Sequence, residues 1–303
     1  MKQIIQGDKT TWVDVTKPTQ QDVEYLKNQY HFHPMVLDEL IPRAYYPRLE
    51  IRPDYLFLTI NYPAYHETNR EVAPRELDIL LTKDTIVTNH HRPLPLLDNL
   101  FKICQRPEIE GEQYLNKGAG YLLFSILDIF WRDCLLKLEK IDGEIEQIER
   151  KIFQGKEKEM VKEISHTKTD IIDFLRIVEP QQEIMKLLEK EAPKFFGEEL
   201  SLHFSDVLGT YEKVWHTTKS HKDTILALED TNQSMLTTKT NETIRILTVF
   251  SVIMLPLTLL ASIWGMNVNL PFGEHEAGFW IIAALMVSVL IIMFYYFRKK
   301  KWL

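Results

Sequence analysis

The chain has 303 residues, and 43 Asp and Glu outnumber 36 Lys and Arg to give a formal net charge of −7. Proteins that bind nucleic acid neutralise its phosphates with clustered Lys and Arg, so the acidic balance argues against that class and favours cations as partners. The length accommodates about two domains, which allows a domain in water and a membrane part in one chain.

Residues 1–110 are predicted to form a mixed α/β domain. Apolar runs rich in β-type residues alternate there with proline-rich and polar segments, which is typical of short strands between turns. Strands are predicted at 55–60, 77–81 and 85–88, with a turn at 82–84, and helices at 19–30 and 34–40.

Residues 111–245 are predicted to form long cytoplasmic helices, the last of which continues into a membrane. Apolar residues recur at steps of three, four and seven, as on one face of a helix: Leu122, Ile126, Ile129, Leu136, Ile141, Ile145, Ile148 and Ile152. Pro180, Pro193 and Gly197 interrupt this pattern, and a further helical stretch begins at Glu198. A soluble coiled coil has the same pattern, but the apolar segments that follow favour the stalk of a membrane protein.

Two apolar runs near the end of the sequence have the length of membrane spans. Residues 246–264 and residues 279–297 each contain nineteen amino acids without a charge, close to the roughly 20 that cross a bilayer core. The loop at 265–278 carries two Glu and no Lys or Arg, whereas residues 298–303 form a basic tail. By the positive-inside rule both termini are cytoplasmic and the loop lies outside. We therefore expect a multi-pass protein of the plasma membrane.

One face of the first span and of the helical stretch before it carries both polar and apolar side chains. The residues at this helical spacing are Asn241, Ile244, Thr248, Ser251, Leu255, Thr258 and Ser262. Hydroxyl groups on such a face can line a pore, but they can also bond to a carbonyl of the preceding turn or pack against another helix. The spacing therefore predicts either a pore wall or a packing surface.

The sequence offers no catalytic constellation. His31 with His33 and His90 with His91 lack a third ligand at zinc spacing, so we interpret these histidines as surface or interface residues. No Gly-rich phosphate loop with a Walker lysine is present, and no set of nucleophile, base and metal ligands can be assembled. We expect neither an enzyme nor an organic cofactor, and ion movement would be passive.

The residues after the first span carry a resemblance to a known family. Gly265, Met266 and Asn267 end that span, a short acidic loop and a second span follow, and the chain closes on Lys-Lys-Lys-Trp-Leu. Together these features resemble the CorA family of magnesium and cobalt transporters. Similar segments stand at 33–40, 138–142 and 239–242.

The resemblance implies an α+β cytoplasmic domain, long stalk helices and two C-terminal transmembrane helices, assembled as a homopentamer around a central pore. Copies of the first span would line this pore. Family positions on the pore wall match Asn241, Ile244, Leu255 and Thr258.

The selectivity filter is expected at Gly265, Met266 and Asn267. In a pentamer, Asn267 would supply a ring of neutral carbonyl oxygens that hydrogen-bond the water held by Mg²⁺. Gly265 is expected to adopt a positive φ where the span ends, and Met266 to pack beneath the ring.

Regulatory ions are also implied by the resemblance. The family holds divalent cations between neighbouring subunits at positions that match Asp38, Glu39, Asp128, Asp206 and Asp230. A shared cation would clamp the subunits together when cytoplasmic Mg²⁺ is high, which would close the pore. Alternatively, these carboxylates are solvated faces of charged helices.

The transported ion has an alternative. Family members devoted to magnesium commonly follow the motif with Met-Pro-Glu, whereas residues 268–274 read Val-Asn-Leu-Pro-Phe-Gly-Glu. We expect influx of magnesium, with cobalt or nickel as further ions. The alternative is a zinc transporter that resembles the ZntB branch, which has the same fold and motif. The alternative from another class is a non-transporting membrane anchor for a coiled coil, which needs neither the polar face nor the Gly-Met-Asn turn.

Overall fold

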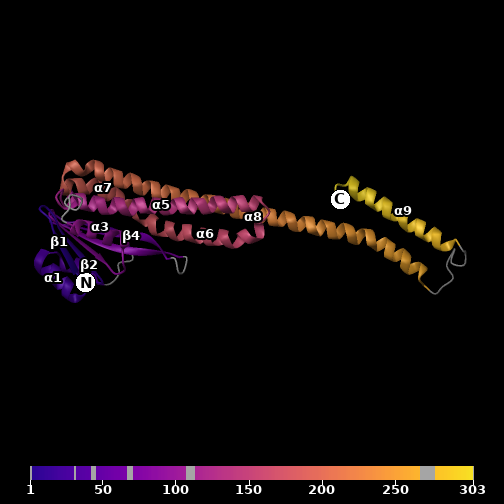
Figure 1. The fold of residues 1–303 in the computed structure, drawn as a ribbon, viewed down its shortest axis with the longest axis horizontal. Coiled ribbons are helices and arrows are strands. Elements are labelled where there is room, and N and C mark those ends of the chain that lie inside the picture. The colour runs from indigo at the N-terminus through magenta and orange to yellow at the C-terminus, as the bar shows by residue number, and fades with distance from the viewer. Residues whose placement is uncertain are drawn as a thin grey trace. The chain divides into compact units, whose positions relative to one another are not determined.

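The computed structural model describes residues 2–30, 32–41, 46–66, 71–106, 113–266 and 277–302 (Figure 1). The chain divides into two compact units, Met1–Glu229 and Asp230–Leu303. The predicted mixed α/β domain lies in the first unit and the two predicted spans lie in the second, whereas the predicted long helices at 111–245 extend past the boundary at Glu229.

A six-stranded sheet forms the centre of the α/β domain. Its strands are β1 (Lys2–Gln6), β2 (Thr11–Thr16), β3 (Arg48–Ile51), β4 (Leu56–His66), β5 (Glu71–Leu81) and β6 (Thr85–His90). The order is β1-β2-β6-β5-β4-β3, and neighbours are antiparallel except for β2 and β6. The predicted strands correspond to β4, β5 and β6. The predicted turn between the last two is closed by Thr82 N–H, which donates to the Thr85 carbonyl at 2.9 Å.

Both faces of the sheet are covered, because successive side chains of a strand point to opposite sides. On one face, Trp12 and Ile86 belong to a core that includes α3 (Pro95–Gln105) and α5 (Ala119–Phe153). On the other face, Val13 and Val87 pack with α1 (Gln20–Tyr30) and α2 (Pro34–Asp38). The two predicted helices are confirmed as α1 and α2, and α3 was not predicted.

The predicted long helices are α5, α6 (Glu157–Val178), α7 (Gln182–Phe196) and α8 (Ser201–Trp264), with short 3₁₀ turns at Glu179–Gln181 and Glu198–Leu200. Pro180 lies in the first of these turns. Pro193, however, lies inside α7 and does not interrupt it. Its ring is buried, so packing offsets the one backbone hydrogen bond that a proline removes. Gly197, with φ of +132°, ends the helix.

Helices α5 and α8 run parallel to each other within the first unit. The rings of Phe124 and His203 are 4.8 Å apart, and those of Trp131 and Tyr211 are 5.0 Å apart. The residue numbers of the contacts thus increase in the same direction along both helices, as parallel helices require.

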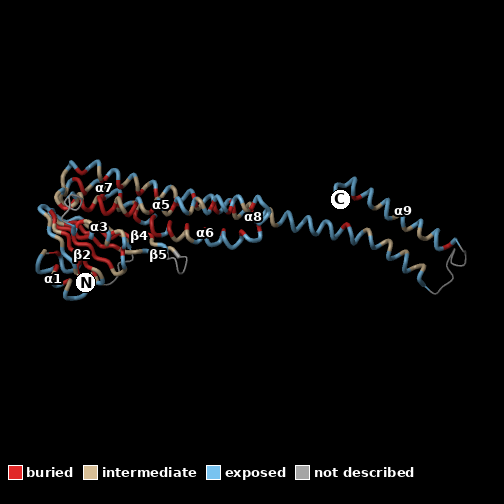
Figure 2. Tube along the Cα trace, in the orientation of Figure 1, coloured by how far each residue is buried: buried red, intermediate tan, exposed pale blue. Residues whose placement is uncertain are grey.

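The second unit consists of the remainder of α8 and of α9 (Gly278–Lys299). Helix α8 is a single helix of 64 residues, which confirms the prediction of one helix running from the stalk into the first span. Figure 2 shows that most described residues of this unit are exposed, in contrast to the buried sheet of the first unit.

Candidate functional site

Among the described residues, two helices are apolar enough to cross a membrane, namely α8 and α9. Their large apolar side chains are uncovered in the single chain: Phe250 is 63% exposed, Leu255 is 69% exposed and Ile292 is 66% exposed. A surface of this size and composition is unfavourable in water. Lipid or neighbouring helices must therefore cover it.

The residues predicted to line a pore lie along one side of α8. They are all exposed in the single chain: Asn241, Ile244, Thr248, Ser251, Leu255, Thr258 and Ser262. Because α8 is unbroken here and turns by about 100° a residue, they fall within an arc of about 100°. Exposure fits a pore wall and a lipid-facing side equally, so the assignment of these residues to a pore wall stays a prediction.

Two hydroxyl groups of this arc bond to their own helix. The Oγ1 of Thr248 donates to the Ile244 carbonyl at 2.8 Å, and that of Thr258 donates to the Met254 carbonyl at 2.8 Å. A hydroxyl that donates its proton in this way keeps its acceptor lone pairs. Back-bonding is thus compatible with a pore wall, because the oxygen can still accept a hydrogen bond from the water around a cation.

The predicted filter begins at the last turn of α8. Gly265 N–H donates to the Ala261 carbonyl at 3.0 Å, and Met266 N–H donates to the Ile263 carbonyl at 3.3 Å. Gly265 is not among the described residues with positive φ, so the predicted left-handed turn is wrong at this position. A Cβ added to Gly265 would lie 3.1 Å from the Ala261 carbonyl oxygen. Glycine is therefore favoured at this position by close backbone contact rather than by a left-handed turn. Asn267 lies outside the described residues, and its role stays a prediction.

Glu39 is the C-cap of α2 and forms an ion pair with Arg48 of β3. The guanidinium also lies 3.4 Å from the carboxylate of Glu50 and 4.6 Å from the centre of the Phe57 ring. The side chains of Glu39 and Arg48 are 42% and 29% exposed. The candidate ligand Glu39 is thus reachable from solvent but already has a cationic partner in its own chain. Arg48 has no local sequence signal for this position, because strand pairing rather than a motif places it beside Glu39.

The other four predicted ligands lie on separate elements or faces. Asp128 on α5 is paired with Arg132, whose Nε lies 2.7 Å from both carboxylate oxygens. The remaining three are exposed: Asp38, Asp206 and Asp230. In the described part of the chain, no three Asp, Glu, His or Cys converge on a metal position. Carboxylates are the ligands that Mg²⁺ prefers, so the donor chemistry fits, but a multidentate site would need a second copy of the chain.

A buried polar network ties the acidic end of α2 to the sheet. The Leu40 carbonyl accepts a hydrogen bond from Asn89 Nδ2 at 3.2 Å, and the ring of His91 lies 3.2 Å from the same oxygen. Asn89 also donates to the buried Asp78 at 3.0 Å. Burial raises the pKa of Asp78 to about 6, although its hydrogen bonds and the nearby Arg48 lower it. The position of the acidic end therefore depends on side chains of the central strands.

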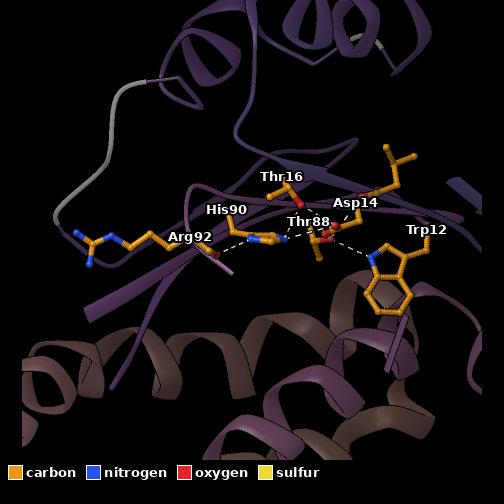
Figure 3. Close-up of polar contacts among 7 residues, drawn as sticks. Trp12, Asp14, Thr16, Thr88, His90 and Arg92 are labelled. Carbon is orange, nitrogen blue, oxygen red and sulfur yellow. Dashed lines mark hydrogen bonds and ion pairs between the residues drawn. The ribbon is translucent and has the colours of Figure 1, made fainter. Parts of the chain in front are cut away.

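A second buried network involves His90, which Figure 3 shows between Asp14 and the Arg92 backbone. Its Nε2 lies 3.4 Å from Asp14 Oδ2, and its Nδ1 lies 2.8 Å from the Arg92 carbonyl. Thr88 donates to Asp14 at 2.5 Å and accepts from Trp12 Nε1 at 3.0 Å. Burial lowers the pKa of His90, but the hydrogen bond and charge of Asp14 outweigh this effect and raise it.

The interpretation of His90 as a surface or interface residue is wrong, because β6 is an inner strand of the sheet and the side chain is 1% exposed. His91 is half-buried. His33 is exposed as predicted, and its Nδ1 accepts a hydrogen bond from Met35 N–H at 3.3 Å at the start of α2. His31 lies outside the described residues.

Curated proteins resemble the chain over most of its length. The cobalt/magnesium transport protein CorA of Thermotoga maritima is 28% identical over 97% of this chain and 83% of its own length. The protein of the same name from Methanocaldococcus jannaschii is 23% identical over 96% of this chain and 91% of its own length.

Solved structures share the fold. The complete CorA magnesium transporter of Methanocaldococcus jannaschii matches 97% of this chain and 92% of its own chain with a TM-score of 0.81 at 22% identity. The ZntB cytoplasmic domain of Vibrio parahaemolyticus matches 76% of this chain and 88% of its own with a TM-score of 0.61 at 12% identity. The family described as "CorA-like Mg2+ transporter protein" matches residues 7–299. The chain therefore belongs to the CorA family of membrane transporters.

Proposed function

We propose that the chain is one subunit of a homopentameric channel that admits Mg²⁺ into the cell across the plasma membrane, with Co²⁺ and Ni²⁺ as further ions. Both termini would be cytoplasmic. The observation that carries this proposal is the side of α8 on which hydroxyl and amide groups follow one another toward the Gly-Met-Asn motif, in a chain that belongs to the CorA family.

Family membership supports transport rather than catalysis. Proteins of the CorA family are channel-type transporters and not enzymes, and the chain has two helices of membrane-spanning composition among its described residues. A membrane anchor without transport needs no polar face on its span, whereas four Ser and Thr residues of the first span recur on one side of α8.

The proposed pore passes a hydrated ion. Mg²⁺ dehydrates reluctantly, so neutral oxygens that accept hydrogen bonds from its water suit it better than ligands that strip the water away. Asn267 would form such a ring at the outer mouth, and Thr248 and Thr258 would offer hydroxyl oxygens along the wall. Ile244 and Leu255 would form apolar rings, which can stop conduction by losing their water.

The proposed channel closes when cytoplasmic Mg²⁺ is high. Cations shared between subunits by the predicted ligands, Glu39 and Asp230 among them, would bind the closed arrangement better than the open one. This feedback requires that the carboxylates be accessible, which agrees with the exposure of Asp230 and the partial exposure of Glu39.

Ion uptake into liposomes tests the proposal. The purified protein should carry Mg²⁺ into vesicles that contain an ion-sensitive dye, while protein-free vesicles should show none. Parallel assays with Co²⁺, Ni²⁺ and Zn²⁺ compare the alternatives. Transport of Zn²⁺ in preference to Mg²⁺ would support the ZntB alternative, and no transport of any of these ions would support a membrane anchor.

A further inference from the structure

We infer that Arg48 competes with the regulatory cation for Glu39 and thereby sets the Mg²⁺ concentration at which the channel closes. This inference rests on the proposed closure by cytoplasmic Mg²⁺. Arg48 is not among the residues predicted to line the pore or to bind regulatory cations.

Several contacts hold the guanidinium of Arg48 beside the candidate ligand. It is paired with Glu39, lies 3.4 Å from Glu50, and has its carbon atom 4.6 Å from the Phe57 ring centre. The side chain is only 29% exposed. Attraction between the cation and the ring face adds to the two ion pairs. Arg48 is therefore a fixed partner of Glu39 rather than a mobile surface charge.

This pair opposes cation binding in two ways. A carboxylate oxygen that is ion-paired with a guanidinium has less capacity for a metal ion or for the water around it. The positive charge of Arg48 also repels an arriving dication. Because both side chains are partly exposed, the solvent screens these effects, and the competition should amount to about two- to fivefold in apparent affinity.

Glu50 gives Arg48 a second partner when a cation takes Glu39. The Nη1 of Arg48 lies 3.4 Å from the Glu50 carboxylate, so the guanidinium can keep an ion pair without leaving its place on the Phe57 ring. Glu50 should therefore lower the cost of releasing Glu39. Removing its charge should strengthen the hold of Arg48 on Glu39 and weaken cation binding.

The other arginine beside a predicted ligand is held less firmly. Arg132 pairs with Asp128 one turn away on α5, and its side chain is 67% exposed. Such helix-surface pairs contribute little. Arg176 provides a control for the loss of one positive charge, because it pairs with Asp173 one turn away on α6 and its side chain is 74% exposed.

The test measures the Mg²⁺ concentration that gives half of the thermal stabilisation of the full-length protein in detergent, and half-closure of flux in liposomes. Arg48→Gln keeps much of the stem over Phe57 and removes the charge. We expect it to lower both midpoints by about two- to fivefold. Glu50→Gln should raise them, Arg176→Gln should leave them near wild type, and Glu39→Gln should raise them strongly.

The outcomes separate the inference from the function on which it rests. If Glu39→Gln leaves both midpoints unchanged, Glu39 is no regulatory ligand and the proposed closure at this site fails. If Glu39→Gln raises them while Arg48→Gln leaves them unchanged or also raises them, the closure stands and the competition is refuted. If Arg48→Gln folds poorly, Glu50→Gln tests the competition instead. An unchanged or lowered midpoint for Glu50→Gln also refutes the competition.

Discussion

At the scale of single residues, the proposed selectivity depends on Asn267. We predict that Asn267→Ala reduces Mg²⁺ uptake by liposomes at least tenfold, because it removes the ring of carbonyl oxygens and leaves the helices intact. Asn269→Ala, two positions further along the same loop, is the control and should transport like wild type. Size-exclusion chromatography should show the same assembly for both. Equal uptake by the two variants would remove Asn267 from the filter.

His90 gives a prediction about stability and pH. Its raised pKa means that the folded protein holds the proton more tightly than the unfolded chain does. The stabilisation is therefore full below the ordinary pKa of about 6.5 and is lost as the pH rises through the folded-state value. We predict that His90→Gln lowers the free energy of unfolding by about 1–3 kcal/mol at pH 6 and by less at pH 8.

Denaturant unfolding of the full-length protein, followed by tryptophan fluorescence across this pH range, measures the difference. His166→Gln is the control, because His166 is exposed on α6 and outside the buried network. A deficit for His90→Gln that grows as the pH rises would contradict the assigned ion pair with Asp14.

At the scale of elements, the arc on α8 carries the proposed conduction path. Leu255 is predicted to form an apolar ring there, and Leu255→Ser should raise flux at high internal Mg²⁺ severalfold, because a polar ring stays wet. Phe250→Ser is the control. Phe250 precedes Leu255 by five positions, which places it about 140° away around the helix. Equal effects of both changes would show that α8 has no distinct pore side.

The elements that could be predicted from the sequence are those with a local signal. The spans follow from uncharged runs of sufficient length, and α1, α2 and the long helices follow from their periodicity. Strands β1 and β3 are short and lie at the edges of the sheet, with few apolar residues to mark them. Helix α3 was not predicted, although its sequence does carry a local signal. It begins at Pro95 and repeats apolar residues, which are buried in the structure, at helical spacing.

The site residues that were missed depend on contacts between distant segments. His90 stands in a polar run, Asn89-His90-His91-Arg92, that suggests a surface, but its strand is paired on both sides within the sheet. Arg48 reaches Glu39 because β3 pairs with β4. Neither placement follows from spacing along the chain. The order of residues on α8, in contrast, follows from the helix alone.

At the scale of the whole molecule, the proposed orientation predicts which parts of the chain face the outside. A cysteine introduced as Glu274→Cys should react with a membrane-impermeant thiol reagent in intact cells, and Leu303→Cys should react only after permeabilisation. The native Cys104 and Cys134 are buried, so they should contribute little background. The reverse pattern of labelling would invert the topology and place the predicted regulatory carboxylates outside the cell.

Passive conduction of Mg²⁺ is tested most directly by the reversal potential of the current that the purified protein carries across a planar bilayer with different Mg²⁺ concentrations on the two sides. A passive pore for a divalent cation should shift this potential by about 30 mV for each tenfold change in the Mg²⁺ ratio. We predict that shift, with no dependence on a proton gradient. A reversal potential that does not change with the Mg²⁺ gradient, or the absence of any current carried by Mg²⁺, would show that the protein is not a passive Mg²⁺ pore.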